Sequence, residues 1–421
     1  MNDIERFDVA VIGGGPAGLA AALSAESEGA KVILIERENR LGGILKQCIH
    51  DGFGLVRFKK KMAGPEYAEK FIEEVKKSNI QVELLTFAIN VEKKNELIHL
   101  TLVSRSGIRE IIAKSLILST GCRERTVKQI GIHGTRPSGI FTAGTAQYYT
   151  NILGQLPTKR CIILGSGDIG LIMARRLTLE GAEVLGVYEA KSTPSGLMRN
   201  ISQCLNDFNI PLYTSHTVTR VFGERRLTSV EIAKVYENMK PIKGTEEIIE
   251  CDSLILSVGL IPENELAESL NIPLDTRTKG PIADQNYMTM EEGIFICGNA
   301  MHVNDLVDYV SESGESAGKA AANYCISNRT MAKINADYNF LYTIPQRVDI
   351  NKISDKIVIF FRSSKERGET VLTLTVDDKE IFSKKYRSLR PPEMERIVVN
   401  FNKFKIHENS NIQLSLREVH K

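Results

Sequence analysis

The feature that most constrains this chain is a glycine-rich turn between a short apolar strand and a small-residue helix, and the chain contains it twice. In the first copy, a strand pattern at Phe7 to Ile12 runs into a GGGPAG turn at residues 13–18. A helical pattern from Leu19 to Glu28 follows, and then Lys31 to Glu36 reads as a second buried strand. Together these segments predict a βαβ unit.

The second copy begins more than a hundred residues later. Arg160 to Leu164 is an apolar strand pattern, and a GSGDIG turn at 165–170 follows it directly. A helical stretch from Leu171 to Glu180 and a strand from Glu183 to Glu189 complete the unit. Because the two copies share one layout, the sequence predicts two separate dinucleotide-binding domains.

Each turn has the chemistry that a diphosphate needs. In the pattern G-x-G-x-x-G the backbone can approach a pyrophosphate, and the following helix presents free N–H groups and about half a positive charge. A lone turn of this kind can be a tight strand-to-helix connection and nothing more, but two complete copies argue against coincidence. The glycines in these places are Gly13, Gly15 and Gly18 in the first copy, and Gly165, Gly167 and Gly170 in the second.

An acidic residue follows each turn after about twenty residues, where a carboxylate can accept hydrogen bonds from the ribose hydroxyls. These residues are Glu36 and Glu189. A carboxylate about 4 Å from a 2′-phosphate charge would repel it by roughly 4 kcal/mol at an effective dielectric constant of 20. Glu189 therefore favours NAD over NADP, and Lys191 is the one nearby residue that argues otherwise.

The remaining patterns divide the chain into three parts. Between the two copies the sequence predicts a helix at Tyr67 to Lys77 and strands at Ile98 to Val103 and Glu110 to Ser119. Later predictions are strands in Val218 to Val235, Glu247 to Val258 and Gly293 to Gly298, and a small-residue helix from Gly314 to about Ile326. We expect a first domain at 1–125 and 285–330, and a second at 126–284.

Residues 331–421 differ in composition from the rest of the chain. β-branched and aromatic residues alternate in KIVIFF, ETVLTLTV, RIVVNF and NIQLSL, with turns expected at Asp377-Asp378 and Arg390-Pro391-Pro392. This predicts a small all-β domain. The expected fold class is thus α/β, with two Rossmann-like domains of three layers and a C-terminal all-β domain.

Composition excludes several classes of protein. The chain has 54 basic and 52 acidic residues, which leaves no field strong enough to attract nucleic acid or an anionic membrane. No signal peptide is visible after Met1, and no apolar run is long enough for a membrane helix. The seven cysteines are scattered and form no C-x-x-C pair or other metal-ligand spacing, so we expect no metal site and a reducing, cytoplasmic location.

Several segments together carry a family resemblance. The two glycine turns, the pair Thr120-Gly121, the GLIP segment at 259–262 and GIFICGNA at 293–300 come in the order of the two-dinucleotide-domain flavoprotein reductases. Residues 5–330 resemble the thioredoxin-reductase and NADH-oxidase superfamily. Within it, LGGILKQCIHDGFG, TGCRER and DLVDYVSESGE are similar to flavoprotein subunits of opine oxidase and hydrogen cyanide synthase type, and to reductases associated with glycerol-3-phosphate dehydrogenases.

The resemblance implies FAD on the first domain and NAD(H) on the second. For FAD it implies Gly13, Gly15, Pro16, Ala17, Gly18, Glu36, Arg37, Gly42, Gly43, Ile44, Thr120, Gly121, Gly298, Asn299, Asp308, Tyr309 and Val310. For NAD it implies Gly165, Gly167, Asp168, Ile169, Gly170, Glu189 and Gly259.

Some of these residues have expected places. The resemblance puts Gly42 to Ile44 near the flavin ring and Thr120-Gly121 near the adenosine. Asn299 stands where the family has an acid on the ribityl chain, and it can hydrogen-bond but carries no charge. Asp308 to Val310, expected just before the last helix, would offer backbone N–H groups to the pyrimidine edge.

The chain departs from the disulfide reductases of this superfamily. They need two cysteines beside the flavin, whereas here Cys48 stands alone after the LGG turn. Cys48 with His50 is the candidate for chemistry near the flavin, and the plainer interpretation is a buried cysteine and a hydrogen-bonded histidine lining a pocket.

The expected reaction is hydride transfer between NAD(H) and FAD, which needs no acid or base. The resemblance implies electron exchange with a partner dehydrogenase or oxidase subunit that acts on glycerol 3-phosphate or an amine, and hence an oligomer or heteromer. Two alternatives stay open: a stand-alone NADH oxidase or peroxide reductase that uses Cys48, and a non-catalytic scaffold that carries a flavin.

Overall fold

The chain forms two compact units. The computed structural model describes residues 4–353, 356–402, 404 and 406–419, so the expected outer limits of the first and last domains, residues 1 and 421, lie outside it. Unit 1 consists of the described parts of Met1–Leu45, Asp51–Cys122 and Pro262–Lys421, and unit 2 consists of Lys46–His50 and Arg123–Ile261. Apart from the short stretch at 46–50, the chain crosses between the units at β9 (Cys122–Glu124) and β19 (Leu260–Pro262), which pair with each other. The second of these crossings precedes the expected domain boundary at 284/285.

Unit 1 is built around a seven-stranded sheet. Strand β8 is long enough to change partners, because its first half pairs with the antiparallel strand β7 while its last residues pair with the parallel strand β20. The path is β5 (Gln81–Glu83), β2 (Val32–Ile35), β1 (Glu5–Ile12), β8 (Gly107–Leu118), β7 (Leu97–Ser104) and β6 (Phe87–Lys94), with β20 (Ile294–Ile296) beside β8.

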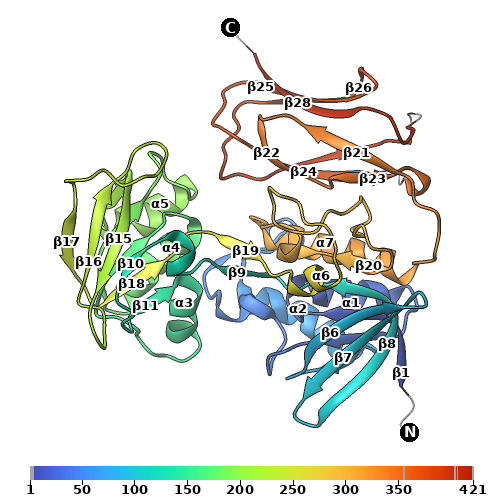
Figure 1. Cartoon of the computed structure of the whole chain (residues 1–421), viewed down its shortest axis with the longest axis horizontal. Helices are drawn as coiled ribbons and strands as arrows, with labels where there is room; N and C mark the ends of the chain where they lie inside the picture. Colours follow the sequence, from blue (N-terminus) through green and yellow to red (C-terminus); the bar gives the residue numbers. More distant parts are fainter. Residues whose placement is uncertain (1–3, 354–355, 403, 405, 420–421) are drawn as a thin grey trace. The chain divides into compact units, whose positions relative to one another are not determined.

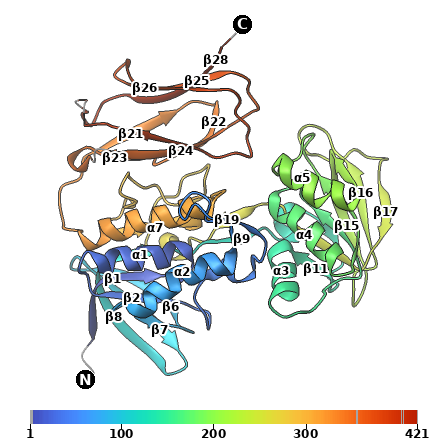
Figure 2. The same cartoon turned by 180° about the vertical axis from the view of Figure 1, so that it is seen from behind.

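Small residues let two helices of unit 1 pack closely (Figure 2). They are α1 (Pro16–Ser27) and α7 (Val307–Ala322), and a third helix, α2 (Gly64–Lys77), also packs on α1. A Cβ on Gly314 would lie 2.1 Å from the carbonyl oxygen of Ala17, and one on Gly318 would lie 2.2 Å from that of Ala21. Only glycine therefore permits this helix spacing.

The start of α7 corrects one prediction. The sequence predicts a helix from Gly314, but α7 begins at Val307, seven residues earlier. The small residues from Gly314 onward predict the later turns of the helix. The first two turns carry no such pattern, because they include Val307, Tyr309 and Val310, which have modest helix propensity. Asp308 to Val310 therefore belong to the first turn of α7 and do not precede it.

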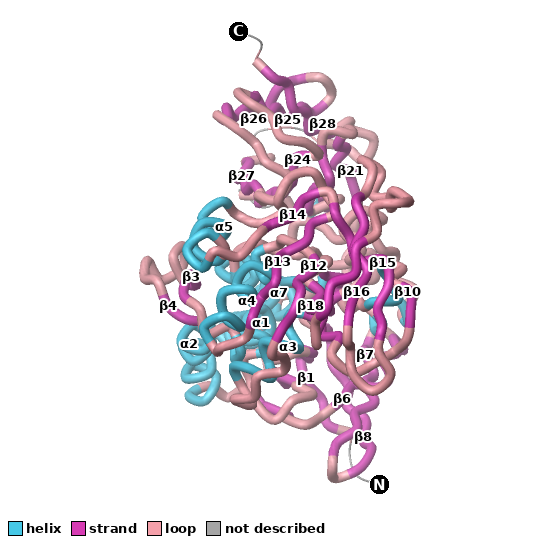
Figure 3. Tube along the Cα trace, turned by 90° about the vertical axis from the view of Figure 1, so that its left-hand side faces the viewer, coloured by secondary structure: helices cyan, strands magenta, loops and turns pink. Residues whose placement is uncertain are grey.

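Unit 2 has a parallel five-stranded sheet, drawn as magenta tubes in Figure 3. Its strands are β11 (Ile140–Thr142), β18 (Ser253–Leu256), β12 (Arg160–Leu164), β13 (Glu183–Glu189) and β14 (Leu212–Thr214), and its helices are α3 (Ala143–Asn151), α4 (Asp168–Leu179) and α5 (Met198–Cys204). A second sheet contains β10 (His133–Gly134), β15 (His216–Phe222), β16 (Ser229–Lys234) and β17 (Glu247–Glu250). Strands β12 and β13 have the bounds that the sequence predicts.

The C-terminal segment of unit 1 folds as two β-sheets, drawn in orange to red in Figure 1. One sheet contains β23 (Arg347–Asp349), β21 (Met331–Ala336), β28 (Ile412–Glu418), β25 (Thr370–Val376) and β26 (Lys379–Tyr386), and the other β22 (Phe340–Ile344), β24 (Ile357–Ser363) and β27 (Glu395–Val399). Asp377 and Asp378 both have positive φ, as the tight turn between β25 and β26 requires. We call these two sheets the β domain.

The remaining elements of the chain are short. They are β3 (Asp51–Phe53), β4 (Met62–Ala63) and α6 (Glu265–Ser269), with 3-10 turns at Gly43–Gln47, Val127–Ile130, Asn206–Phe208, Gly298–Ala300 and Ile350–Lys352. Within the described ranges, no helix combines the length and the apolar character needed to span a membrane.

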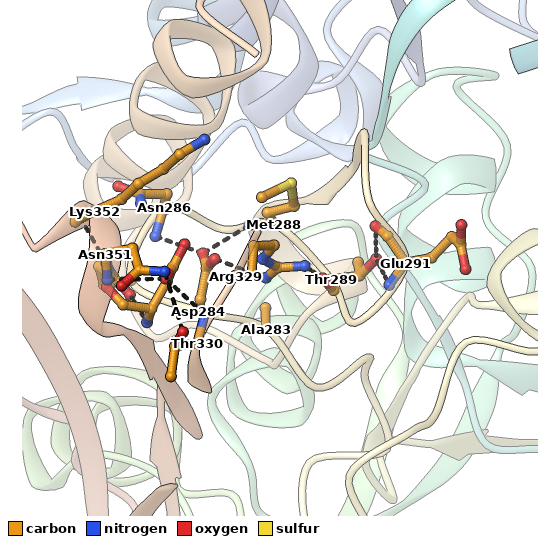
Figure 4. A network of polar contacts seen from close by, with 12 residues as sticks. Ala283, Asp284, Asn286, Met288, Thr289, Glu291, Arg329, Thr330, Asn351 and Lys352 are labelled. Atoms are coloured by element: carbon orange, nitrogen blue, oxygen red, sulfur yellow. Dashed lines mark hydrogen bonds and ion pairs between the residues drawn. The ribbon is translucent and has the colours of Figure 1, made fainter. Parts of the chain in front are cut away.

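A buried ion pair fixes the segment that leads into β21, the first strand of the β domain (Figure 4). Arg329 lies 2.8 Å from Asp284, and the two side chains are 7% and 0% exposed. Asp284 also accepts the backbone N–H groups of Asn286 and Met288, and Arg329 donates to the carbonyl of Thr289. The buried charges of Arg329 and Asp284 therefore compensate each other.

Breaking this pair should destabilise the protein strongly. We expect Arg329→Gln to lower the free energy of unfolding by about 3 kcal/mol, because the Asp284 carboxylate would stay buried without its counter-charge. Arg390→Gln is the matched control, since Arg390 lies 3.6 Å from Glu366 on the surface, and its loss should cost less than about 1 kcal/mol. Urea denaturation measures both, and equal effects would contradict the assignment.

Candidate dinucleotide sites

The first glycine turn leaves β1 in a conformation that only glycine adopts easily. Gly13 has φ +107°, and a Cβ there would lie 2.4 Å from the carbonyl oxygen of Ser119 at the end of β8. A Cβ on Gly18 would lie 1.8 Å from the carbonyl oxygen of Gly13. These two glycines let the turn and the first turn of α1 fold against the sheet.

Gly15 has a different role, because the space beside it is open. A Cβ on Gly15 would meet only the Cα of Gly43, at 3.9 Å. Gly42 donates its N–H to the carbonyl of Gly14 at 2.8 Å, so a second glycine segment faces the turn. Gly15 is the N-cap of α1, and Pro16 and Ala17 begin the helix. The turn can thus accept a diphosphate against the helix start without a side chain in the way.

Glu36 is placed where the sequence predicts an acid. It is buried at the end of β2, and one carboxylate oxygen accepts the N–H of Gly14 at 2.7 Å while the other accepts the N–H of Glu38 at 2.8 Å. These bonds fix the carboxylate next to the turn. It can accept further hydrogen bonds from a ribose, because each oxygen has two lone pairs.

The second turn repeats this geometry in unit 2. Gly165 has φ +101°, and its Cβ would lie 2.1 Å from the carbonyl oxygen of Ser257 at the end of β18. A Cβ on Gly170 would lie 2.5 Å from the carbonyl oxygen of Gly165. Gly167, the N-cap of α4, has only Ser257 Oγ near its open side, at 3.9 Å. The second turn therefore offers the same unobstructed helix start.

Glu189 occupies the position in unit 2 that Glu36 occupies in unit 1. It is buried at the end of β13 and accepts the N–H of Ser166 at 3.1 Å, the hydroxyl of Ser166 at 2.6 Å and the N–H of Lys191 at 3.0 Å. The backbone, and not the ammonium group, of Lys191 makes this bond. These bonds fix a carboxylate that can accept further hydrogen bonds.

The segment after β13 is held beside the second turn. Ser195 donates its N–H to Ser166 Oγ at 2.9 Å, and Asp168 accepts the N–H of Leu197 at 2.9 Å and the amide of Asn200 at 2.7 Å. The Asp168 side chain is thus bonded to this segment, and Asp168 is also the first residue of α4. The next residue, Ile169, is 37% exposed.

Four further predicted residues lie in the segments that follow β2, β8 and β18. Arg37 pairs with Glu263 at 3.3 Å, and Thr120 donates its hydroxyl to the carbonyl of Glu263 at 2.6 Å. Gly121 has φ +75° and accepts the N–H of Glu263 at 3.0 Å. The sequence patterns did not point to Glu263, although it directly follows the GLIP segment. In unit 2, Gly259 has φ +103° and accepts the N–H of Arg125 at 3.1 Å.

The segment after β20 returns to α1. Gly298 has φ +63°, and its N–H is bonded to Ser313 Oγ at 2.9 Å. A Cβ on Gly298 would lie 2.8 Å from the Cβ of Ala17, so the backbone here must approach the start of α1. The amide of Asn299 donates to Cys122 Sγ at 3.6 Å and its oxygen accepts the N–H of Asn304 at 3.0 Å.

The first turn of α7 is held in place by side chains from elsewhere in unit 1. Asp308 is buried and accepts the N–H of Arg57 at 3.1 Å, and the guanidinium of Arg57 bonds Glu315. Tyr67 donates its hydroxyl to Ser311 at 2.9 Å. Val310 is buried. Neither Arg57 nor Tyr67 carries a motif, so sequence patterns do not reveal this role.

Cys48 and His50 belong to the short stretch of unit 2 at residues 46–50, whereas Gly42, Gly43 and the exposed Ile44 belong to unit 1. The Cys48 thiol points at Gln147 Oε1, 3.8 Å away. Burial raises the pKa of Cys48 to about 12, so at neutral pH the sulfur is a thiol and a poor nucleophile. That Cys48 and His50 take part in catalysis stays a prediction.

Comparison with known proteins identifies similar sequences. The family model described as pyridine nucleotide-disulphide oxidoreductase matches residues 7–322. The chain is 22% identical to an opine oxidase subunit of Agrobacterium tumefaciens over 338 residues, which cover 75% of this chain and 64% of that protein. It is 27% identical to hydrogen cyanide synthase subunit HcnB of Pseudomonas protegens over 283 residues, 62% of this chain and 58% of the other.

The fold also matches a solved structure. Thioredoxin reductase of T. acidophilum superposes with a TM-score of 0.62 at 20% identity, covering 76% of this chain and 98% of that one. The two-Rossmann-domain architecture is therefore confirmed. The chain spans about three fifths of the length of the two curated subunits. The β domain lies beyond the residues that the family model matches.

Proposed function

Since this chain belongs to the pyridine nucleotide-disulphide oxidoreductase family, we propose that it transfers a hydride between NAD(H) held by unit 2 and FAD held by unit 1. The observation that carries the proposal is the pair of open helix starts at Gly15 and Gly167, each with a buried glutamate fixed beside it. Both cofactors are those of the family.

The protein's own part in this reaction is binding and orientation. Bound FAD supplies the ring that exchanges the hydride with the nicotinamide, and this step needs no proton relay. In unit 1 the N–H groups at the start of α1 bind the diphosphate and Glu36 binds the ribose. In unit 2 the start of α4 and Glu189 do the same for NAD(H). The fixed glutamates position each nucleotide before reaction.

Glu189 selects NAD(H) over NADP(H). Three donors hold its carboxylate in place, so the side chain cannot turn away from a 2′-phosphate without losing them. The 2′-phosphate of NADP(H) would then meet nearly the whole repulsion from this carboxylate, roughly 4 kcal/mol at an effective dielectric constant of 20. Lys191, the nearby basic residue, bonds Glu189 through its backbone N–H.

The electrons pass to or from a partner subunit. Both curated relatives are named as subunits of larger oxidases or synthases, which supports a heteromeric assembly for this chain. We propose a partner dehydrogenase that oxidises glycerol 3-phosphate or an amine. Co-purification from the native source, followed by assay of the complex with each substrate, tests this choice.

Anaerobic mixing of the purified yellow protein with NADH and with NADPH tests the proposed reaction. We expect NADH to bleach the visible flavin band within seconds and NADPH to do so at least a hundredfold more slowly. A flavin that NADH never bleaches would support the non-catalytic scaffold. Bleaching by both nucleotides at one rate would contradict the role of Glu189.

Replacing Cys48 separates the proposal from a thiol-dependent oxidase. Because the Cys48 sulfur is a protonated thiol at neutral pH, we expect Cys48→Ser to change NADH-dependent reduction of an artificial electron acceptor less than twofold. A peroxide reductase that uses this thiol would instead lose its turnover in the same variant. Loss of turnover in Cys48→Ser, with flavin reduction by NADH intact, would establish that alternative.

A further inference from the structure

The contacts of the β domain point to a role in the flavin site itself. Asp305, in the loop before α7, accepts the backbone N–H of Met394 at 2.6 Å with one carboxylate oxygen and bonds the guanidinium of Arg362 with the other. Both partners come from the β domain. We call Asp305, Arg362 and Met394 the Asp305 cluster.

Each nitrogen of the Arg362 guanidinium has a hydrogen-bond partner. It bonds Asp305, donates to the Tyr342 hydroxyl at 2.8 Å, and donates to the carbonyl of Pro392. The Arg362 side chain is only 13% exposed and Asp305 is its ion-pair partner. Asp305 therefore compensates the charge of Arg362. Removing either member of such a desolvated pair leaves the other charge without its partner, which destabilises the local structure.

A second set of contacts holds the first two turns of α7 itself. Arg396 of β27 bonds Glu312 and lies 5.9 Å above the ring of Tyr309. Phe360 of β24 packs on the same ring, with the centroids 5.5 Å apart. Phe360 also belongs to the same buried core as the main sheet of unit 1. The β domain thus holds Tyr309 and Glu312 of α7 by charge and by packing.

A third contact reaches back towards Asn299. His302 is buried, and its ring lies 5.7 Å from the rings of both Tyr342 and Phe360. The contacts of the β domain therefore extend from His302 to Glu312. This is the segment that joins the predicted ribityl residue Asn299 to the predicted pyrimidine-edge residues Asp308 to Val310.

We infer that the β domain, through the Asp305 cluster, positions the start of α7 against FAD and so sets the affinity and reduction potential of the bound flavin. A helix start stabilises negative charge within its first turn only, so a small displacement of α7 changes how well it stabilises charge on the ring. Arg57 and Tyr67 bond Asp308 and Ser311 of α7, and the Asp305 cluster holds the loop just before the helix. Arg362 and Asp305 are positioning residues in this inference, which rests on the proposed function.

Asp305→Asn and Arg362→Gln test the inference, with Arg367→Gln as the matched control. Arg367 is a buried arginine of the same domain that bonds Ser363, Asn339 and Glu418, all within the β domain. We expect Asp305→Asn and Arg362→Gln each to raise the Kd for FAD about tenfold and to make the flavin midpoint potential more negative. The double variant should change the Kd and the potential little more than each single variant does, because the two residues share one interaction. Arg367→Gln should lower Tm but change neither quantity.

Three outcomes decide the matter. The Asp305→Asn variant should fold normally, because the Asp305 side chain is partly exposed. If this variant keeps the wild-type Kd for FAD and the wild-type flavin potential, the inference is overturned. It is also overturned if Arg367→Gln shifts both quantities as much, because the effect would then be general destabilisation. A wild-type protein that takes up no FAD would overturn the proposed function, and this inference with it.

Discussion

Gly15→Asp is expected to abolish FAD binding and to leave the fold intact. Gly15 has φ −78°, which any residue adopts, and its open side meets only Gly43, so the new side chain fits. Aspartate is also a favourable N-cap. Its charge, however, would occupy the diphosphate position, and at about 4 Å two unit charges repel by roughly 4 kcal/mol. We expect the Kd for FAD to rise at least a hundredfold in a fluorescence titration.

A neighbouring glycine gives the contrast. Gly18→Ala would bring a Cβ within 1.8 Å of the Gly13 carbonyl, so it should lower Tm as well as FAD content. Gly15→Asp should instead unfold at the temperature of wild-type protein from which FAD has been removed. Normal FAD content in Gly15→Asp would show that the diphosphate binds elsewhere.

Gly167→Asp should have the complementary effect in unit 2. Gly167 has φ −64° and an open side, so the same reasoning predicts a folded protein that keeps FAD. Its Kd for NADH should rise at least a hundredfold, and NADH at ordinary concentrations should no longer bleach the flavin. Dithionite, which needs no nucleotide site, should still bleach it.

Binding to the two units can therefore be separated. A yellow Gly167→Asp protein that NADH reduces at the wild-type rate would contradict the assignment of NAD(H) to unit 2. Loss of FAD from this variant would show that the two turns are not independent sites. Isothermal titration with NAD⁺ distinguishes weaker binding from slower reduction.

The sequence predicts the two dinucleotide units well because their signals are local. Arg160–Leu164 and Glu183–Glu189 are strands with the predicted bounds, and the glycines and glutamates meet because a strand, a turn and a helix bring them together. The same local reasoning places α7 too late, because its first two turns depend on packing against residues far away in the chain.

Other parts of the site could not be predicted for the same reason. The role of Glu263 depends on contacts with Arg37 and Thr120, more than a hundred residues earlier. Asp305 and Arg362 are 57 residues apart and belong to no motif. The environment of Cys48 follows from Gln147, and only the folded chain shows that burial raises its pKa.

Counting bound nucleotides is the most direct test of the central claim, that each glycine turn binds one dinucleotide. Equilibrium dialysis of the wild-type protein should give one FAD and one NAD(H) per chain. Gly15→Asp should lose only FAD, and Gly167→Asp should lose only NAD(H). A wild-type chain that binds one dinucleotide in total, or variants that lose the same one, would contradict the account.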